Sequence, residues 1–374
     1  MAWGRVRIWG TIALVAAALL IAGGVVGVRI TVGILRDKVV KALGPGSEIG
    51  ALHIGWFTVE VERLRIQGGP GWPAADALRA ERVVITPSVR TLLSDRVRIR
   101  SLVVIRPYLS ALRTRDGQLR VLPSLLPSPG GQERVGTVAI SGITLEDGIV
   151  DLFDATVSQP PLKIRLEQVH ATVGEVMAPT LEGKSQFDLT AVVKGAQRDG
   201  RVHVSGWAEV ATRDSSVRMV LRSGDLVALQ PYLVRAGETR IQKGTLDLDL
   251  DSEVRNQHLR APGRVVISDL EFAPGRGTWD TFMGLPRGAV VSSLKNKDNK
   301  IEVDFVMEGD LDNPQFVLNE AFTTRVAVAT AERLGLSIRE VVEGLSGLER
   351  KGRSESAQGV EEAVRGLLGG RRKP

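Results

Sequence analysis

Apolar and polar side chains alternate along much of the chain between residues 44 and 318. The clearest run is 246–251, in which Leu246, Leu248 and Leu250 are separated by aspartates. Alternation with a period of two gives a β-strand one apolar and one solvated face, which is typical of antiparallel sheets. The sequence therefore predicts a mainly β fold of about 15 such strands.

Residue pairs that favour turns lie between the alternating runs. They are Asp116-Gly117, Asp147-Gly148, Asp199-Gly200 and Lys243-Gly244. Asp-Gly is a typical hairpin signal, because both residues readily adopt the positive φ that a tight turn requires. We therefore expect the chain to reverse direction at these pairs.

Helical periodicity is rare by comparison. The spacing of apolar residues predicts helices over 31–43, 88–93, 225–233 and 319–348. These helices are too few to cover one face of a long sheet, and an apolar sheet face must be covered by something. Three solutions stay open: a sheet closed on itself, two sheets packed face to face, or a face filled by a ligand.

An uncharged run, 8–28, lies near the N-terminus between Arg7 and Arg29. Its length matches the roughly 20 residues that cross a bilayer as a helix. A cleaved signal peptide is the alternative, although its apolar core would be only about 7–15 residues long. The short basic lead, 1–7, is typical of a signal anchor whose body lies outside the cytoplasm. We expect a transmembrane helix at 8–28.

The residue types that many enzymes use are scarce. The 374 residues include no cysteine and four histidines, and no nucleophile-elbow, phosphate-loop or zinc-protease motif occurs. The aspartates of 247–251 resemble the start of a calcium-binding loop. However, Ser252 stands where that loop needs glycine, and His258 where it needs glutamate. We therefore predict no enzyme activity, no catalytic residue, no cofactor and no metal site.

The formal net charge of +6 is unevenly distributed. Residues 1–41 carry six basic and one acidic side chain, and residues 90–120 carry eight arginines and two aspartates, so the remainder is net acidic. A nucleic-acid site would place stacking aromatics among its basic residues, but the stretch 90–120 contains only Tyr108. We expect no nucleic-acid partner. The arginines form either the solvated face of strands or a contact with anionic lipid headgroups.

These patterns divide the chain into consecutive parts. The expected parts are a short cytoplasmic lead (1–7), the transmembrane helix (8–28), an N-terminal module (31–122), a linker rich in proline and glycine (123–135), a β body (136–318), a helix (319–348) and a polar, basic tail (349–374). The tail contains a short amphipathic stretch, which either frays or lies on a membrane.

Several short sequence motifs follow one another in the same order as in a known protein family. The first group follows the N-terminal span and short helix and consists of residues 43–54, 59–66, 82–87, 88–93, 97–109 and the Asp-Gly hairpin 113–119. The second group consists of residues 148–154 with Pro160-Pro161, and of residues 230–233 with 241–246. The last motif is 309–316. This arrangement resembles the AsmA-like proteins of the Gram-negative envelope. Those proteins are similar to bridge-like lipid transfer proteins with a chorein-type start.

The resemblance implies a single-pass protein of the bacterial inner membrane with its body in the periplasm. It implies an elongated, twisted antiparallel sheet curled into an open apolar groove, followed by a C-terminal helix. In such a groove acyl chains are shielded while headgroups stay in water, so phospholipid could be conducted in support of outer-membrane lipid homeostasis. The implied partners are phospholipid acyl chains, the inner membrane and other envelope proteins. The alternative is an envelope scaffold or outer-membrane assembly factor without lipid cargo.

The apolar positions of the alternating runs are the candidates for the wall of this groove. They are Val97, Ile99, Ile164, Leu166, Phe187, Leu189, Val202, Val204, Leu246, Leu248, Leu250, Val265, Ile267, Ile301, Val303 and Phe305. All are aliphatic or phenylalanine side chains, which suit an acyl chain because they offer it no specific polar contact.

Overall fold

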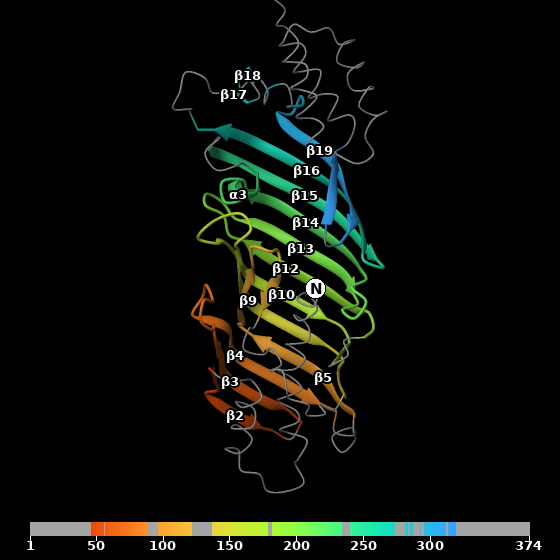
Figure 1. Ribbon diagram of the computed structural model, residues 1–374. Helices are drawn as coiled ribbons and strands as arrows, with labels where there is room; N and C mark the ends of the chain where they lie inside the picture. Colours follow the sequence, from red (N-terminus) through yellow and green to blue (C-terminus); the bar gives the residue numbers. More distant parts are fainter. Residues whose placement is uncertain are drawn as a thin grey trace, which may run out of the picture.

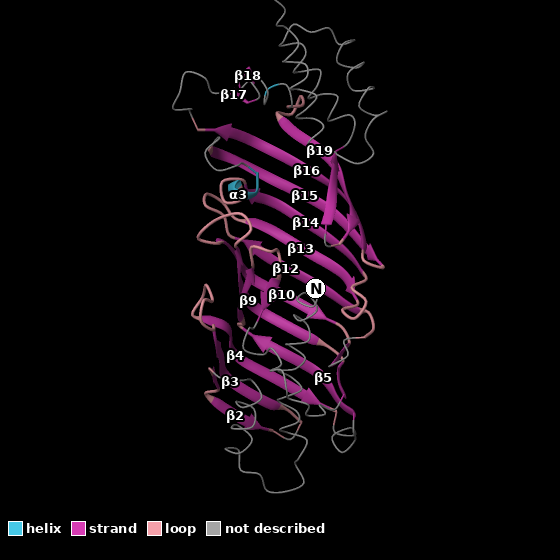
Figure 2. Cartoon of the chain, viewed as in Figure 1, coloured by secondary structure: helices cyan, strands magenta, loops and turns pink. Residues whose placement is uncertain are grey.

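Strands dominate the protein, as the alternation predicts. The computed structural model describes residues 46–55, 57–88, 96–121, 137–178, 182–233, 240–273, 281–282, 285–286, 292, 295–311 and 313–318. Within these residues, eighteen strands form one large sheet and two short strands form a second. Figure 2 shows how little helix accompanies them; α3 (Gln230–Leu233) is a single turn. The prediction of a mainly β fold is confirmed.

The strands vary widely in length. In the N-terminal half they are β1 (Ser47–Glu48), β2 (Ala51–Ile54), β3 (Val59–Gln67), β4 (Asp76–Pro87), β5 (Arg96–Ile105), β6 (Tyr108–Arg113), β7 (Leu119–Val121), β8 (Thr137–Ile140) and β9 (Ile143–Asp154). The later strands are β10 (Leu162–Val173), β11 (Val176–Ala178), β12 (Ser185–Val193), β13 (Gly200–Ala208), β14 (Ser215–Asp225), β15 (Ile241–Arg255), β16 (His258–Phe272), β17 (Thr281–Phe282), β18 (Leu285–Pro286), β19 (Lys300–Asp310) and β20 (Asn313–Leu318).

Neighbouring strands follow one another along one long axis, from β2 near one end to β19 near the other (Figure 1). The succession β9, β10, β12, β13, β14, β15, β16, β19, β20 is antiparallel throughout. Three pairings are parallel, namely β5 with β8, β5 with β9, and β6 with β9. A purely antiparallel sheet is therefore the wrong prediction here. Beyond β7 the chain crosses over and brings β8 and β9 alongside earlier strands in the same direction.

Two of the expected chain reversals occur. Asp116-Gly117 lies between β6 and β7, and Asp199-Gly200 ends the connection from β12 to β13. Asp147-Gly148 and Lys243-Gly244 lie inside the long strands β9 and β15 instead, so these two predictions are wrong. Asp147 has φ 52° and Gly244 has φ 148°, and the pairing shifts register beside both pairs. A β-bulge there uses the backbone freedom that a turn would use.

Most of the predicted helices fall outside the described residues. These are 8–28, 31–43, 319–348 and all of 88–93 except Ser88. Within the part of the chain that the structure describes, no helix is long and apolar enough to cross a membrane. The helix expected at 225–233 is shorter than predicted, because residues 226–229 form turns and only α3 is helical. Pro231 explains the late start, since proline fits only the first turn of a helix.

Buried apolar side chains are concentrated around β3–β9. Val61 and Ile85 are 0% exposed and Ile143 is 2% exposed, and all three belong to the largest core cluster. Two smaller clusters lie farther along the sheet, one around Leu226 and one around Leu259. The core is therefore extensive in the N-terminal half and sparse in the C-terminal half.

Candidate functional site

Cross-strand register brings apolar residues of successive strands into one line. Val204 of β13, for example, pairs with Leu189 of β12 on one side and with Met219 of β14 on the other. Directly paired residues lie on the same face of a sheet, so the line continues from pair to pair. This line, the apolar row, consists of Leu52, Val61, Val83, Val104, Leu145, Ala171, Leu189, Val204, Met219, Leu250, Gly263 and Phe305.

The apolar row contains no polar or charged side chain. Its members come from twelve strands, and at about 4.8 Å between strands it extends over roughly 50 Å. A second line runs beside it from β12 to β19 and consists of Ala191, Val202, Leu221, Leu248, Val265 and Val303. The C-terminal half of the sheet therefore carries a broad aliphatic face.

Exposure changes along the apolar row. In the N-terminal half most of the side chains are buried, with Val61 0% and Val83 3% exposed, and only Val104 and Leu145 are partly buried. In the C-terminal half the residues from Leu189 to Leu250 are only partly buried, and the row ends at Phe305, which is 7% exposed. Aliphatic side chains that reach solvent on an uncharged face are the most unusual surface feature of these strands. We take this half of the row, with the second line, as the candidate site.

Most of the predicted wall residues lie on this face. Those on the two lines are Leu189, Val202, Val204, Leu248, Leu250, Val265, Val303 and Phe305. Leu246, Ile267 and Ile301 form a third, shorter line, and Ile164, Leu166 and Phe187 flank the apolar row on β10 and β12.

Other predicted wall residues are nearly inaccessible or only partly described. Leu246, Ile301 and Phe305 lie on this face but are only 8%, 5% and 7% exposed. Ile99 is 0% exposed and belongs to the N-terminal core cluster, so it is not an accessible wall residue. Of Val97 the structure describes only the backbone, which lies in β5 opposite Val138.

The structure also adds residues that the sequence reasoning missed. Met219 and Leu221 follow the same alternation as the other strands, so the signal for them was present. Gly263 has no side chain and belongs to the apolar row only because it pairs with Leu250 on one side and with Phe305 on the other. A Cβ at that position would come within 2.5 Å of the Phe305 ring, so glycine makes room for that ring.

A short segment after β14 covers one end of the aliphatic face. Leu226 is 1% exposed and lies in a cluster with Leu246. Gly244 lies beneath it, because a Cβ there would be 2.6 Å from Leu226 Cδ1. The buried Asp225 holds this segment in place by accepting a 2.6 Å hydrogen bond from the backbone N–H of Gln197. This end of the face is therefore closed by the chain itself.

The opposite face of the same strands carries charged pairs. Arg222 donates to Asp249 at 2.7 Å, and Arg264 donates to Asp304 at 2.6 Å. Hydrogen bonds to these carboxylates raise the pKa of both guanidinium groups. Asp249 belongs to the calcium-loop-like sequence, and its arginine partner agrees with the interpretation of these aspartates as a solvated strand face. Charge and aliphatic surface are thus segregated onto opposite faces.

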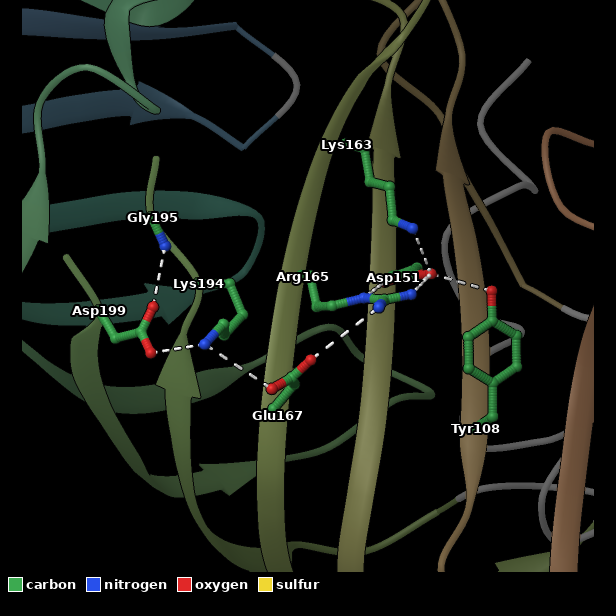
Figure 3. A network of polar contacts seen from close by, with 8 residues as sticks. All are labelled: Tyr108, Asp151, Lys163, Arg165, Glu167, Lys194, Gly195 and Asp199. Atoms are coloured by element: carbon green, nitrogen blue, oxygen red, sulfur yellow. Dashed lines mark hydrogen bonds and ion pairs between the residues drawn. The ribbon is translucent and has the colours of Figure 1, made fainter. Parts of the chain in front are cut away.

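A polar network joins β6, β9 and β10 (Figure 3). Asp151 is 1% exposed and accepts hydrogen bonds from Arg165 at 2.8 and 2.9 Å and from the Tyr108 hydroxyl at 3.0 Å; Lys163 Nζ lies 2.9 Å from it. Burial alone would raise the pKa of Asp151, but these donors outweigh it and lower that pKa below its usual value. Burial and the bond to Asp151 raise the pKa of Tyr108 to about 12.

This network supports the middle of the apolar row. Asp151 alternates with residues that flank the row on β9, so it lies on the opposite face of the same strand. The contacts continue from Arg165 through Glu167 to Lys194, which lies 2.6 Å from Asp199 (Figure 3). The network therefore clamps the strands where the row passes from its buried to its partly exposed half.

The described residues contain no other arrangement that suggests chemistry. Among them, no group of three or more His, Asp or Glu side chains is placed to hold a metal ion. A hollow of about 650 Å³ is lined by Arg65, Arg79 and Arg106. Asp76 lies 2.6 Å from Arg65, and Glu81 lies 3.0 Å from Arg106, so carboxylates balance these cations.

Comparisons with known proteins give no relative: no family model matches the chain, and neither a curated protein nor a solved structure is similar to it. The AsmA-like resemblance therefore rests on the order of short sequence phrases. What the site can do has to be argued from its geometry.

Proposed function

We propose that this protein binds phospholipid and conducts it along the apolar row, as an inner-membrane-anchored periplasmic protein that supports outer-membrane lipid homeostasis. One observation carries the proposal: an uncharged row that passes through twelve strands and is partly exposed from Leu189 to Leu250. The anchor would be the uncharged run 8–28.

Physical chemistry favours acyl chains as the ligand of this face. Each methylene that leaves water for an apolar surface contributes about 0.8 kcal/mol. Successive strands offer nearly the same aliphatic surface, such as Leu248 followed by Val265 and Val303. An acyl chain that slides from one strand to the next therefore replaces its aliphatic contacts by equivalent ones, and no specific polar bond has to break. Headgroups would remain in water beyond the strand ends.

The proposal also requires a particular curvature of the sheet. Its twist would curl the C-terminal half into an open groove with the two aliphatic lines on the inner face and the ion pairs of Arg222 and Arg264 outside. The segment that holds Leu226 over Leu246 would form one lip of the groove. The elongated arrangement of strands in Figure 1 suits a path along the sheet better than a single enclosed cavity.

A second candidate is a scaffold or outer-membrane assembly factor without lipid cargo. The observation that favours it is the burial of the N-terminal half of the row, where Val61 and Val83 are almost inaccessible. A face that is packed shut along its whole length would suit a structural spacer.

Lipid analysis of the purified protein separates the two candidates. The full chain is extracted in a mild detergent, exchanged into a lipid-free one and analysed for phospholipid by mass spectrometry. We expect at least one phospholipid per chain to remain bound. A chain that carries no phospholipid after this treatment would refute the transport proposal and leave the scaffold.

A further inference from the structure

The hairpin between β2 and β3 exposes large apolar side chains at one end of the sheet. Its turn is closed by a 2.8 Å hydrogen bond from the Gly55 N–H to the Thr58 carbonyl. Phe57 is 67% exposed and Ile54 is 45% exposed. Among the residues that the structure describes, Tyr232 is the only other large hydrophobic side chain that is exposed to a similar extent. Two such side chains on one turn make an apolar tip.

The tip continues the apolar row to its N-terminal end. Leu52, the first member of the row, lies in β2, and Ile54 pairs with Val59 next to the turn of the same hairpin. The sequence places Trp56 directly before Phe57. Tryptophan favours the level of lipid headgroups, because its ring is apolar and its N–H is polar, and phenylalanine is common on apolar surfaces that insert into a membrane interface.

The charge of the hairpin indicates what kind of surface it suits. The turn and the strand ends beside it, residues 51–62, include Glu60 and Glu62 and neither lysine nor arginine, and the arginines of β3, Arg63 and Arg65, lie farther from the turn. The tip itself therefore carries no cation that would attract anionic headgroups or nucleic acid. Burial of aromatic rings in a bilayer interface needs no such attraction.

We propose that the Phe57 tip inserts into the interface of a phospholipid bilayer and holds the N-terminal end of the apolar row against that membrane. This deepens the proposed function, because it names the place where lipid would pass between the bilayer and the row. The sequence adds an independent argument: the predicted span 8–28 ends only a short stretch before β1 begins at Ser47, so the hairpin is tethered close to a membrane.

The absence of cysteine allows a direct test with the full chain. Thr58→Cys introduces a single thiol beside the tip, and Asp298→Cys introduces one in an exposed turn before β19. Each variant is labelled with a fluorophore and reconstituted into phosphatidylcholine vesicles that contain brominated phosphatidylcholine as a contact quencher. We expect the fluorophore at position 58 to be quenched at least about threefold more than that at 298, with little change between low and high salt.

Two further variants assign the cause of the quenching. Adding Phe57→Ser to Thr58→Cys should lower the quenching about threefold; because Phe57 is exposed, this change should not affect folding. Adding Val204→Asp, which blocks the C-terminal half of the row, should leave the quenching unchanged. Equal quenching at 58 and 298, or no effect of Phe57→Ser, would overturn the proposal. If Val204→Asp abolished the quenching, the quenching lipid would be one bound to the apolar row, and the tip would not be inserted in the membrane.

These outcomes are separate from those of the proposed function. Bound phospholipid without quenching at position 58 would support the transport proposal and refute the insertion of the tip into the bilayer. Quenching at position 58 without bound phospholipid would leave a membrane-docked scaffold.

Discussion

A single aspartate in place of Val204 should leave the protein folded and lower its bound phospholipid about tenfold or more. Val204 is partly exposed and lies between Leu189 and Met219 on the apolar row. A carboxylate at this position can stay hydrated while the face is empty, so folding should tolerate it. An acyl chain that lies on the row would strip water from that carboxylate, and this cost exceeds the 1.4 kcal/mol that corresponds to a tenfold change in affinity.

Two matched substitutions serve as controls for Val204→Asp. Val192 lies on the opposite face between the oppositely charged Arg201 and Glu167, so Val192→Asp should change neither folding nor lipid content. Val83 belongs to the same row but is 3% exposed, so Val83→Asp should prevent folding of the N-terminal half. Phospholipid content by mass spectrometry and unfolding by circular dichroism check all three. Equal lipid loss in Val204→Asp and Val192→Asp would mean that the apolar face is not the lipid site.

Replacing Asp151 by asparagine should lower the free energy of unfolding by about 2–3 kcal/mol at pH 7. The carboxylate is 1% exposed and faces Arg165, Lys163 and Tyr108, so the substitution removes the charge that these three donors share. Arg165 and Lys163 keep partial access to water, which limits the loss. Urea unfolding of the two proteins side by side measures the difference.

The pH dependence of that difference has a definite sign. The folded pKa of Asp151 is lowered below the unfolded value of about 3.9. Its contribution is therefore complete above that value and is lost as the pH falls through the lower, folded pKa. The gap between the two proteins should stay constant from pH 5 to 8 and shrink below about pH 4. Asp188→Asn, which disrupts an exposed pair with His203, should change stability by less than about 0.5 kcal/mol. A gap that widens in acid would contradict the assignment.

The alternation of side chains predicted the character of the sheet well, since it depends only on neighbours along one strand. The run from Leu246 to Leu250 lies within β15 with its leucines on one face and its aspartates on the other. The same rule predicted most of the residues that share the aliphatic face. Met219 and Leu221 obey it too, since they alternate with Arg218, Val220 and Arg222 along β14.

Features that depend on distant strands could not be predicted in this way. The parallel pairing of β5 with β9 and the continuity of the apolar row depend on register between segments far apart in the chain. Asp147-Gly148 has the chemistry of a turn, but tertiary pairing extends the strand through it and leaves a bulge. The burial of Ile99 likewise depends on residues from other strands that pack around it, and the local sequence around Ile99 does not reveal them.

The central claim is that acyl chains lie on the apolar row, and photo-crosslinking tests it most directly. Met219 and Val220 are adjacent on β14 but lie on opposite faces, since Met219 pairs with Leu250 and Val220 with Asp249. A benzophenone amino acid is placed at one or the other position in the full chain, irradiated in cells, and the purified protein is weighed by mass spectrometry. The account predicts a phospholipid adduct at position 219 and none at 220. No adduct at 219, or equal adducts at both positions, would contradict it.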